Sequence, residues 1–313
     1  MMSVKNLKVV TVTLNPALDL TGSLETLSAG SVNLVQRGSL HPAGKGVNVA
    51  KVLAELGAEV TVTGFLGAEN QASFCQLFES IGLNDAFVRV VGATRINVKV
   101  VEDSGKVTDL NFPGVNVTEA DIVCFEQALL ALAKTHDVFV LAGSLPQGVS
   151  PEKCAQWVRL LQDQGKQVLF DSSKAALTAG LEATPWLIKP NDDELADWAG
   201  KPLTTLASIT EVAETISNLG VRNVVVSRGE HGVMWLDQDG WLSAKPPKMN
   251  VVSTVGAGDT LVAGMCWGHL NQWNKEQTLK FATALSALAV AQVGVGVDSL
   301  ERVEQCMEQV QLA

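Results

Sequence analysis

The stretch VNVAKVLAELGAEVTVT, residues 47–63, contains the unit from which the fold can be predicted. Residues 47–56 place apolar side chains at the spacing of a helix, whereas Val60–Thr63 is a short β-branched run typical of a buried strand. A helix that leads directly into a buried strand is the repeating unit of an α/β protein.

The same alternation continues along the chain on both sides of this stretch. Further strands are expected at Val9–Thr13, Val138–Leu141, Val168–Phe170, Trp186–Ile188 and Val224–Val226. Further helices are expected at Gln71–Ile81, Glu119–Ala133, Pro151–Gln164, Ile209–Leu219, Ala257–Leu270 and Gln277–Gln292. The pattern predicts right-handed crossovers and a three-layer α/β fold, with a mainly parallel central sheet and helices on both faces.

Two segments, Leu18–Leu40 and Arg95–Phe112, interrupt this alternation with short strand-like runs. In the second, Asp103-Ser104-Gly105 separates two such runs and predicts a hairpin turn. We therefore expect one domain over residues 1–313, with a small antiparallel β lid formed by segments at about 15–40 and 95–112.

Composition excludes several classes of protein. Of the 313 residues, 47% are hydrophobic and 18% are charged, a globular balance. The formal net charge of −10 argues against a broad basic surface, so we expect neither a nucleic-acid partner nor a membrane partner. Any anion must therefore be bound at a local site.

The remaining compositional signals indicate a cytoplasmic protein. The five cysteines are scattered without CxxC or zinc-type spacing, which indicates reduced thiols. The first residues lead directly into a strand pattern and do not resemble a signal peptide. Phe281–Val297 is apolar but contains Thr283, Ser286 and Gln292, which favours a buried helix over a membrane span.

The strongest local motif is Val255-Gly256-Ala257-Gly258-Asp259-Thr260, which precedes a clear helical pattern. The glycines allow free N–H groups to gather at a helix N-terminus, where they attract an anion. Asp259 could then take a proton from an attacking hydroxyl while the amides of Gly256, Ala257 and Gly258 stabilise a transferred phosphoryl group. The alternative is a glycine-rich turn with Asp259 as a helix cap.

A second glycine cluster is HPAGKGVN, residues 41–48, at the start of the first long helix. It lacks the spacing of a Walker loop, because position 39 is Ser39 and Lys45 is followed by Gly46. A lysine, free amides and Asn48 around one helix start could bind a sugar and its phosphate. A purely structural turn remains the alternative.

The third motif, Lys189-Pro190-Asn191-Asp192-Asp193-Glu194, lies where a strand ends and a helix begins. Since Mg²⁺ is commonly held through few protein oxygens and several waters, Asn191 and Glu194 could orient the hydrated ion beside ATP phosphates. An acidic first turn that only complements the helix dipole is the alternative.

A fourth motif, SRGEHG at residues 227–232, follows a predicted strand at the edge where nucleotides bind in α/β proteins. It is no dinucleotide fingerprint, because no GxGxxG opens a helix after the first strand. The four histidines show no metal spacing and are expected to be structural or on the surface.

Taken in order, AGKGVNVAKVLAELG, GSLP (residues 143–146), KPNDDEL, SRGEHG and STVGAGDT resemble the ribokinase-like carbohydrate kinases, the PfkB family, from about Thr11 to about Gly296. The resemblance implies ATP and Mg²⁺ as cofactors, Asp259 as base and Gly256 to Gly258 as the anion hole. The remaining implied roles divide as follows: Asp19, Gly44, Lys45, Asn48 and Arg95 for the sugar phosphate; Lys189, Asn191, Ser227, Arg228, Gly229, Glu230, His231, Gly232 and Gly258 for the nucleotide; and Asn191 and Glu194, through water, for the metal. Lys99 lies four residues along the same predicted strand as Arg95 and on the same face, so we also expect it at the sugar phosphate.

Within the family, TLNPALD, HPAGKGVNVAKVL, TRINVK, VTDLNF, FDSSKAAL and STVGAGD are most similar to the branch that phosphorylates the 6-hydroxyl of fructose 1-phosphate. Ser253, where many relatives have Asp or Asn, is shared with that branch. The alternatives are a kinase for tagatose 6-phosphate or fructose 6-phosphate, a kinase for an unphosphorylated sugar or nucleoside, and a non-catalytic sugar-binding regulator. The resemblance also implies a homodimer formed through the lid.

Overall fold

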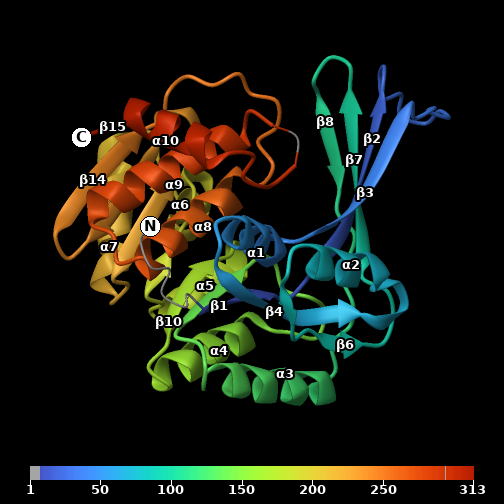
Figure 1. Ribbon diagram of the computed structural model, residues 1–313, viewed down its shortest axis with the longest axis horizontal. Coiled ribbons are helices and arrows are strands. Elements are labelled where there is room, and N and C mark those ends of the chain that lie inside the picture. Colours follow the sequence, from blue (N-terminus) through green and yellow to red (C-terminus); the bar gives the residue numbers. More distant parts are fainter. Residues whose placement is uncertain (1–7, 293) are drawn as a thin grey trace.

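The computed structural model describes residues 8–292 and 294–313. Figure 1 shows a central sheet covered by helices and a smaller sheet that projects from it. Residues 1–7 lie outside the described part. The prediction that the N-terminal stretch is no signal peptide falls partly on these residues. Within the described residues, no helix combines the length and the apolar composition that a membrane span requires.

The central sheet has a parallel middle and an antiparallel edge. Its strands run in the order β15 (Gln311–Leu312), β14 (Gly240–Lys245), β13 (Val233–Asp237), β12 (Asn223–Ser227), β11 (Leu187–Ile188), β10 (Gln167–Asp171), β9 (Val138–Ala142), β1 (Lys8–Thr13), β4 (Glu59–Gly67) and β5 (Asn84–Asp85), with β6 (Val88–Val90) also paired to β4. All pairs from β5 to β12 are parallel, which confirms the predicted α/β core. The pairs from β12 to β15 are antiparallel and were not predicted.

Each face of the sheet is covered by its own set of helices. One face packs against α1 (Lys45–Glu55), α2 (Ala72–Ser80), α8 (Ala257–Leu270), α9 (Lys275–Ala289) and α10 (Leu300–Gln309). The other packs against α3 (Glu119–Leu132), α4 (Pro151–Asp163), α5 (Lys174–Glu182), α6 (Asp192–Ala199) and α7 (Leu206–Asn218). Along β1, Val9 belongs to the first core, whereas Val10 and Val12 belong to the second. A strand buried on both faces has the continuous apolar pattern seen in the sequence.

The predicted helices are all present, and α9 contains the described start of the Phe281–Val297 segment as a buried helix. Two further helices, α5 and α10, were not predicted. The sequence indicated α6 only through the helix start that follows Lys189.

The smaller sheet, which we call the lid, contains β3 (Arg37–Ala43), β2 (Ala17–Leu24), β7 (Arg95–Glu102) and β8 (Val107–Leu110), in that order. The outer pairs, β2–β3 and β7–β8, are antiparallel, and the predicted hairpin at Asp103–Gly105 joins β7 to β8. The central pair, β2–β7, is parallel, so the lid consists of two antiparallel pairs joined by a parallel one. The two lid segments predicted from the sequence therefore form one sheet.

Candidate active site

The helix start of α8 has the conformation that the VGAGDT motif predicts. Gly256 precedes the helix in the left-handed region, with φ 80°, and Ala257 is the first helical residue. Asp259 lies in the first turn, is only 6% exposed, and accepts a hydrogen bond of 2.7 Å from Asn48 Nδ2 of α1. Two residues 211 positions apart in the chain are thereby in direct contact.

Close packing of α1 on β1 places Lys45 in the same site. A Cβ added at Gly46 would collide with Thr13 Oγ1, so only glycine allows the helix to approach the strand so closely. Lys45, the first residue of α1, directs its Nζ to 3.2 Å from Oδ2 of Asp171. Asp171 is the last residue of β10.

Asp171 is the residue of this site that sequence reasoning missed. It is 2% exposed and lies between two lysines, with Lys189 Nζ 3.5 Å from its Oδ1. Lys189, 4% exposed, in turn lies beside α8, because a Cβ at Gly258 would be 3.4 Å from its Nζ. A carboxylate at the carboxyl end of a buried parallel strand was a usable signal, since that edge is where α/β proteins build their sites.

Asp259, Asn48, Lys45, Asp171 and Lys189 form the cluster of the candidate site. The electrostatics of this cluster favour a proton acceptor near neutral pH. Burial, reinforced by the negative charge of Asp171, raises the pKa of Asp259 to about 6, although Asn48, Lys45 and Lys189 oppose the rise. Burial alone would lower the pKa of Lys45, but the surrounding carboxylates, led by Asp171, raise it overall. Lys45 therefore remains a cation beside the catalytic candidate.

Arg95 joins the base of the lid to the core. Its guanidinium donates to the carbonyls of Asn15 (2.9 Å), Phe112 (3.2 Å) and Pro16 (3.3 Å), and it lies 3.4 Å from Ser144 Oγ. Burial lowers the pKa of Arg95, against the influence of Asp19. Among the described residues Arg95 has no salt-bridge partner, so its charge is available to an anion.

The two other lid residues expected at the sugar phosphate, Asp19 and Lys99, pair with each other. Lys99 Nζ lies 2.9 Å from Asp19 Oδ2, and Asn97 Nδ2 donates to Asp19 Oδ1 at 3.3 Å. Since Asp19 neutralises Lys99, the positive charge of this face of the lid resides mainly in Arg95.

The acidic turn at the start of α6 is a capping box. Asn191 Oδ1 accepts from Glu194 N at 2.7 Å, and Glu194 Oε2 accepts from Asn191 N at 3.0 Å. Asn191 and Glu194 therefore stabilise the start of α6, while Glu194 Oε1 makes no hydrogen bond to another described residue. Within the described residues no group of three or more His, Cys, Asp or Glu could hold a metal.

The SRGEHG loop adjoins this turn but is not joined to the Asp259 cluster by a hydrogen bond or ion pair within the described chain. Ser227 N donates to the Pro190 carbonyl at 3.0 Å, and Asn191 forms a bridge with Ser227. Gly229–His231 form a short 3-10 helix, η2, and Arg228 N donates to the Gly232 carbonyl. A Cβ at Gly232 would collide with the Ala244 carbonyl, which explains the glycine.

The described cluster contains the groups that a phosphoryl transfer to a hydroxyl requires. A buried carboxylate with a pKa of about 6 can accept a proton, and a glycine-rich helix N-terminus beside it can stabilise developing negative charge. Two lysines held by one carboxylate add fixed positive charge.

Comparisons with known proteins agree with this chemistry. The model of the pfkB family carbohydrate kinases matches residues 8–302. A 1-phosphofructokinase of Vibrio cholerae is 63% identical over 98% of this chain and 96% of its own, and one of Escherichia coli is 47% identical over 97% and 98%. Among solved structures, phosphofructokinase-2 from Escherichia coli in complex with substrates and products superposes with a TM-score of 0.90 at 28% identity, covering 96% of this chain and 99% of that one. With its buried aspartate at the glycine-rich start of α8, the chain belongs to the pfkB family of carbohydrate kinases.

Proposed function

We propose that this carbohydrate kinase transfers the γ-phosphoryl group of ATP to the 6-hydroxyl of fructose 1-phosphate, giving fructose 1,6-bisphosphate and ADP. The observation that carries the catalytic part is the Asp259 carboxylate, buried and oriented by Asn48 at the N-terminus of α8. The choice of sugar phosphate is supported by the relatives named 1-phosphofructokinase, which cover nearly the whole chain.

In the proposed reaction Asp259 acts as general base. The 6-hydroxyl oxygen attacks the γ-phosphorus, its proton passes to Asp259, and the bond from the γ-phosphorus to the bridging oxygen breaks to release ADP. The N–H groups of Gly256, Ala257 and Gly258 stabilise the negative charge of the transferred group. Lys45 and Lys189 contribute positive charge, and Asp171 fixes their positions.

The existing phosphate of the sugar is bound away from Asp259 in this proposal. Arg95 offers a half-buried guanidinium without a carboxylate partner in the described chain, which suits a charge-assisted hydrogen bond to a phosphate. The sugar-phosphate site is completed by Gly44, Lys45, Asn48 and Asp19. Lys99 acts mainly by holding Asp19.

ATP is assigned to the edge of the sheet between α6 and the SRGEHG loop. Residues 227–232 border the nucleotide, with Lys189, Asn191 and Gly258 toward its phosphates. The link from Ser227 to Pro190 keeps the two strand ends together, which supports one continuous nucleotide site.

Magnesium fits the acidic turn as a hydrated ion. Glu194 keeps one carboxylate oxygen free of other described residues, and its charge reaches Lys45 in the cluster. Mg²⁺ binds through few protein oxygens and several waters, so Glu194 and Asn191 would hold it through water. When bound, the ion neutralises phosphate charge and orients the transferred group.

A homodimer formed through the lid is supported by an exposed apolar row. Leu40, Leu20, Val98 and Leu110 come one from each strand and lie opposite one another across the lid. Leu20, Leu40 and Leu110 are exposed, and the opposite face carries Asp19, Asn97 and Lys99. A second copy would cover the apolar row while the polar face remains with the substrate.

We assign the protein to the cytoplasm. Its cysteines are free thiols, which are compatible with a reducing compartment, and ATP is present there.

Product identification tests this function directly. Purified protein with ATP, Mg²⁺ and fructose 1-phosphate should form a bisphosphate that fructose-bisphosphate aldolase cleaves, together with one ADP for each bisphosphate. ATP hydrolysis without a bisphosphate would contradict the proposal. Binding of the sugar phosphate without any turnover would also contradict it, and would favour a non-catalytic regulator.

A further inference from the structure

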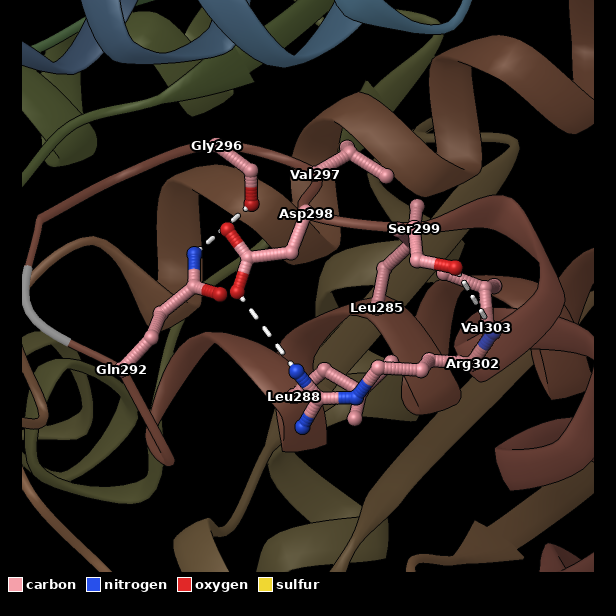
Figure 2. A pocket seen from close by; sticks show the side chains of 9 residues that line it. All are labelled: Leu285, Leu288, Gln292, Gly296, Val297, Asp298, Ser299, Arg302 and Val303. Carbon is pink, nitrogen blue, oxygen red and sulfur yellow. Dashed lines mark hydrogen bonds and ion pairs between the residues drawn. The ribbon is translucent and has the colours of Figure 1, made fainter.

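Segment 295–299, between α9 and α10, is held by hydrogen bonds to the chain that follows α9 and to the start of α10. Gln292 Nε2 donates to the Gly296 carbonyl at 2.9 Å, and Ser299 caps α10 by accepting from Arg302 N at 3.3 Å (Figure 2). The cavity between these residues measures only about 10 Å³, the space of one water, so the side chains around it are closely packed.

The segment is also held by α1. Glu55, the last residue of α1, accepts a hydrogen bond of 2.5 Å from Val297 N through its Oε2. A Cβ added at Gly296 would lie 2.9 Å from the same oxygen, so the carboxylate lies directly against the backbone of the segment. The two partners are 242 positions apart, and nothing in the local sequence of α1 requires an acid there.

The same segment contacts the start of α8. A Cβ added at Gly256 would collide with Cγ2 of Val295, which therefore packs directly on the turn before Asp259. Gly256 holds the left-handed conformation that directs the N–H groups of this turn. A shift of Val295 would free this turn to move.

We infer that Glu55 is a positioning residue for phosphoryl transfer, acting through Val297 and Val295 on the Gly256 turn. This inference rests on the proposed function, in which that turn stabilises the transferred group. Helix α1 then orients the site from both ends, since Asn48 near its start holds Asp259 and Glu55 at its end holds the segment against Gly256. Geometry of this kind is sensitive, because a displacement of about 1 Å can cost on the order of 100-fold in rate.

Steady-state kinetics of Glu55→Ala and Glu55→Gln test this role, with Glu304→Ala on α10 as the control for loss of an exposed acid. We expect Glu55→Ala to lower kcat about tenfold with KM values changed less than about twofold, because the bound ligands are not contacted. Glu55→Gln keeps an acceptor for Val297 N and should retain at least about a third of wild-type kcat. Glu304→Ala should match wild type.

Hydrogen exchange provides a readout that needs no substrate. Amides in the peptide 253–261 should exchange faster in Glu55→Ala than in wild type or Glu304→Ala. If the wild-type protein phosphorylates no sugar phosphate, the proposed function fails. The exchange measurement still tests whether Glu55 holds the Gly256 turn in place. Unchanged exchange and unchanged kcat in Glu55→Ala would overturn the inference, and so would a fall in kcat that Glu55→Gln does not restore.

Discussion

Burial raises the pKa of Asp259 to about 6, which suits a general base and makes the ionised form unfavourable in the folded protein. Asp259→Asn keeps the shape and the contact with Asn48 but removes the proton acceptor, so kcat should fall by roughly 10²–10⁴-fold with little change in KM. Retention of more than about a third of wild-type kcat in Asp259→Asn would remove Asp259 from this role.

The pH profile of the wild-type enzyme provides a second test of the base. Because the carboxyl of Asp259 must be ionised to accept a proton, kcat/KM should decline below about pH 6, following its pKa.

The same pKa also determines the sign of a stability effect. A carboxyl whose pKa is raised on folding destabilises the protein above pH 6, by on the order of 3 kcal/mol, and this cost disappears as the pH falls towards the ordinary value of 3.8. Denaturant unfolding should therefore show Asp259→Asn to be more stable than wild type at pH 7.5, with a difference that shrinks at pH 4.5. An equal difference at both values would contradict the raised pKa.

Asp171 holds two cations, one of them almost fully buried. Asp171→Asn would leave Lys45 and Lys189 without a counter-charge, so we expect about 3 kcal/mol of lost stability and a large fall in kcat/KM. Asp137→Asn is the matched control, because its ion pair with Lys166 has an 88% exposed carboxylate and should matter by less than about 1 kcal/mol. Equal denaturation midpoints for the two variants would show that the buried pair is not needed.

The capping box at the start of α6 makes it possible to separate charge from helix formation. Glu194→Gln keeps an oxygen that can accept from Asn191 N, so the helix should persist while the charge is lost. We expect the Mg²⁺ concentration for half-maximal rate to rise about tenfold and kcat to fall. Asp193→Asn removes a charge from the same turn and should leave the Mg²⁺ titration unchanged. If both titrations match wild type, the turn is only a helix start.

For the lid, the element-scale prediction concerns oligomeric state. Leu110→Glu introduces a charge into the apolar row of both copies and should shift sedimentation from dimer towards monomer, weakening association by about 100-fold. Leu206→Glu on α7 is a matched control, since both leucines are 52% exposed. A wild-type protein that sediments as a monomer at micromolar concentration, or equal behaviour of both variants, would contradict a lid dimer.

Local patterns predicted most elements but not their partners. The short strand-like runs in the sequence predicted β2 and β7. Their parallel pairing, however, joins residues about 80 positions apart and has no local signal. Helix α5 was missed because Gly180 weakens its propensity, and the glycine is there because a Cβ would collide with the ring of Phe170. Helix α10 carried a usable signal in its Ser299 cap and the apolar spacing of Leu300 and Val303.

At the scale of the whole molecule, the site is formed by contacts between distant parts of the chain. Motif residues at helix starts, such as Lys45 and Asp259, could be selected from the sequence because glycines and a following helical pattern mark them. Asp171 could not be assigned a role in this way, since its function depends on a lysine 126 positions away. The pairing of Lys99 with Asp19 was likewise invisible, because strand alternation places side chains on a face without identifying their partners.

The central claim is that the whole site is built for fructose 1-phosphate, and the most direct test compares kcat/KM across related acceptors. ADP release should be followed in one coupled assay with fructose 1-phosphate, fructose 6-phosphate, tagatose 6-phosphate and fructose. We predict that fructose 1-phosphate has the highest kcat/KM, and that fructose is at least about 100-fold poorer because it lacks the phosphate that we propose Arg95 to bind. A higher kcat/KM for fructose 6-phosphate or tagatose 6-phosphate would contradict the account.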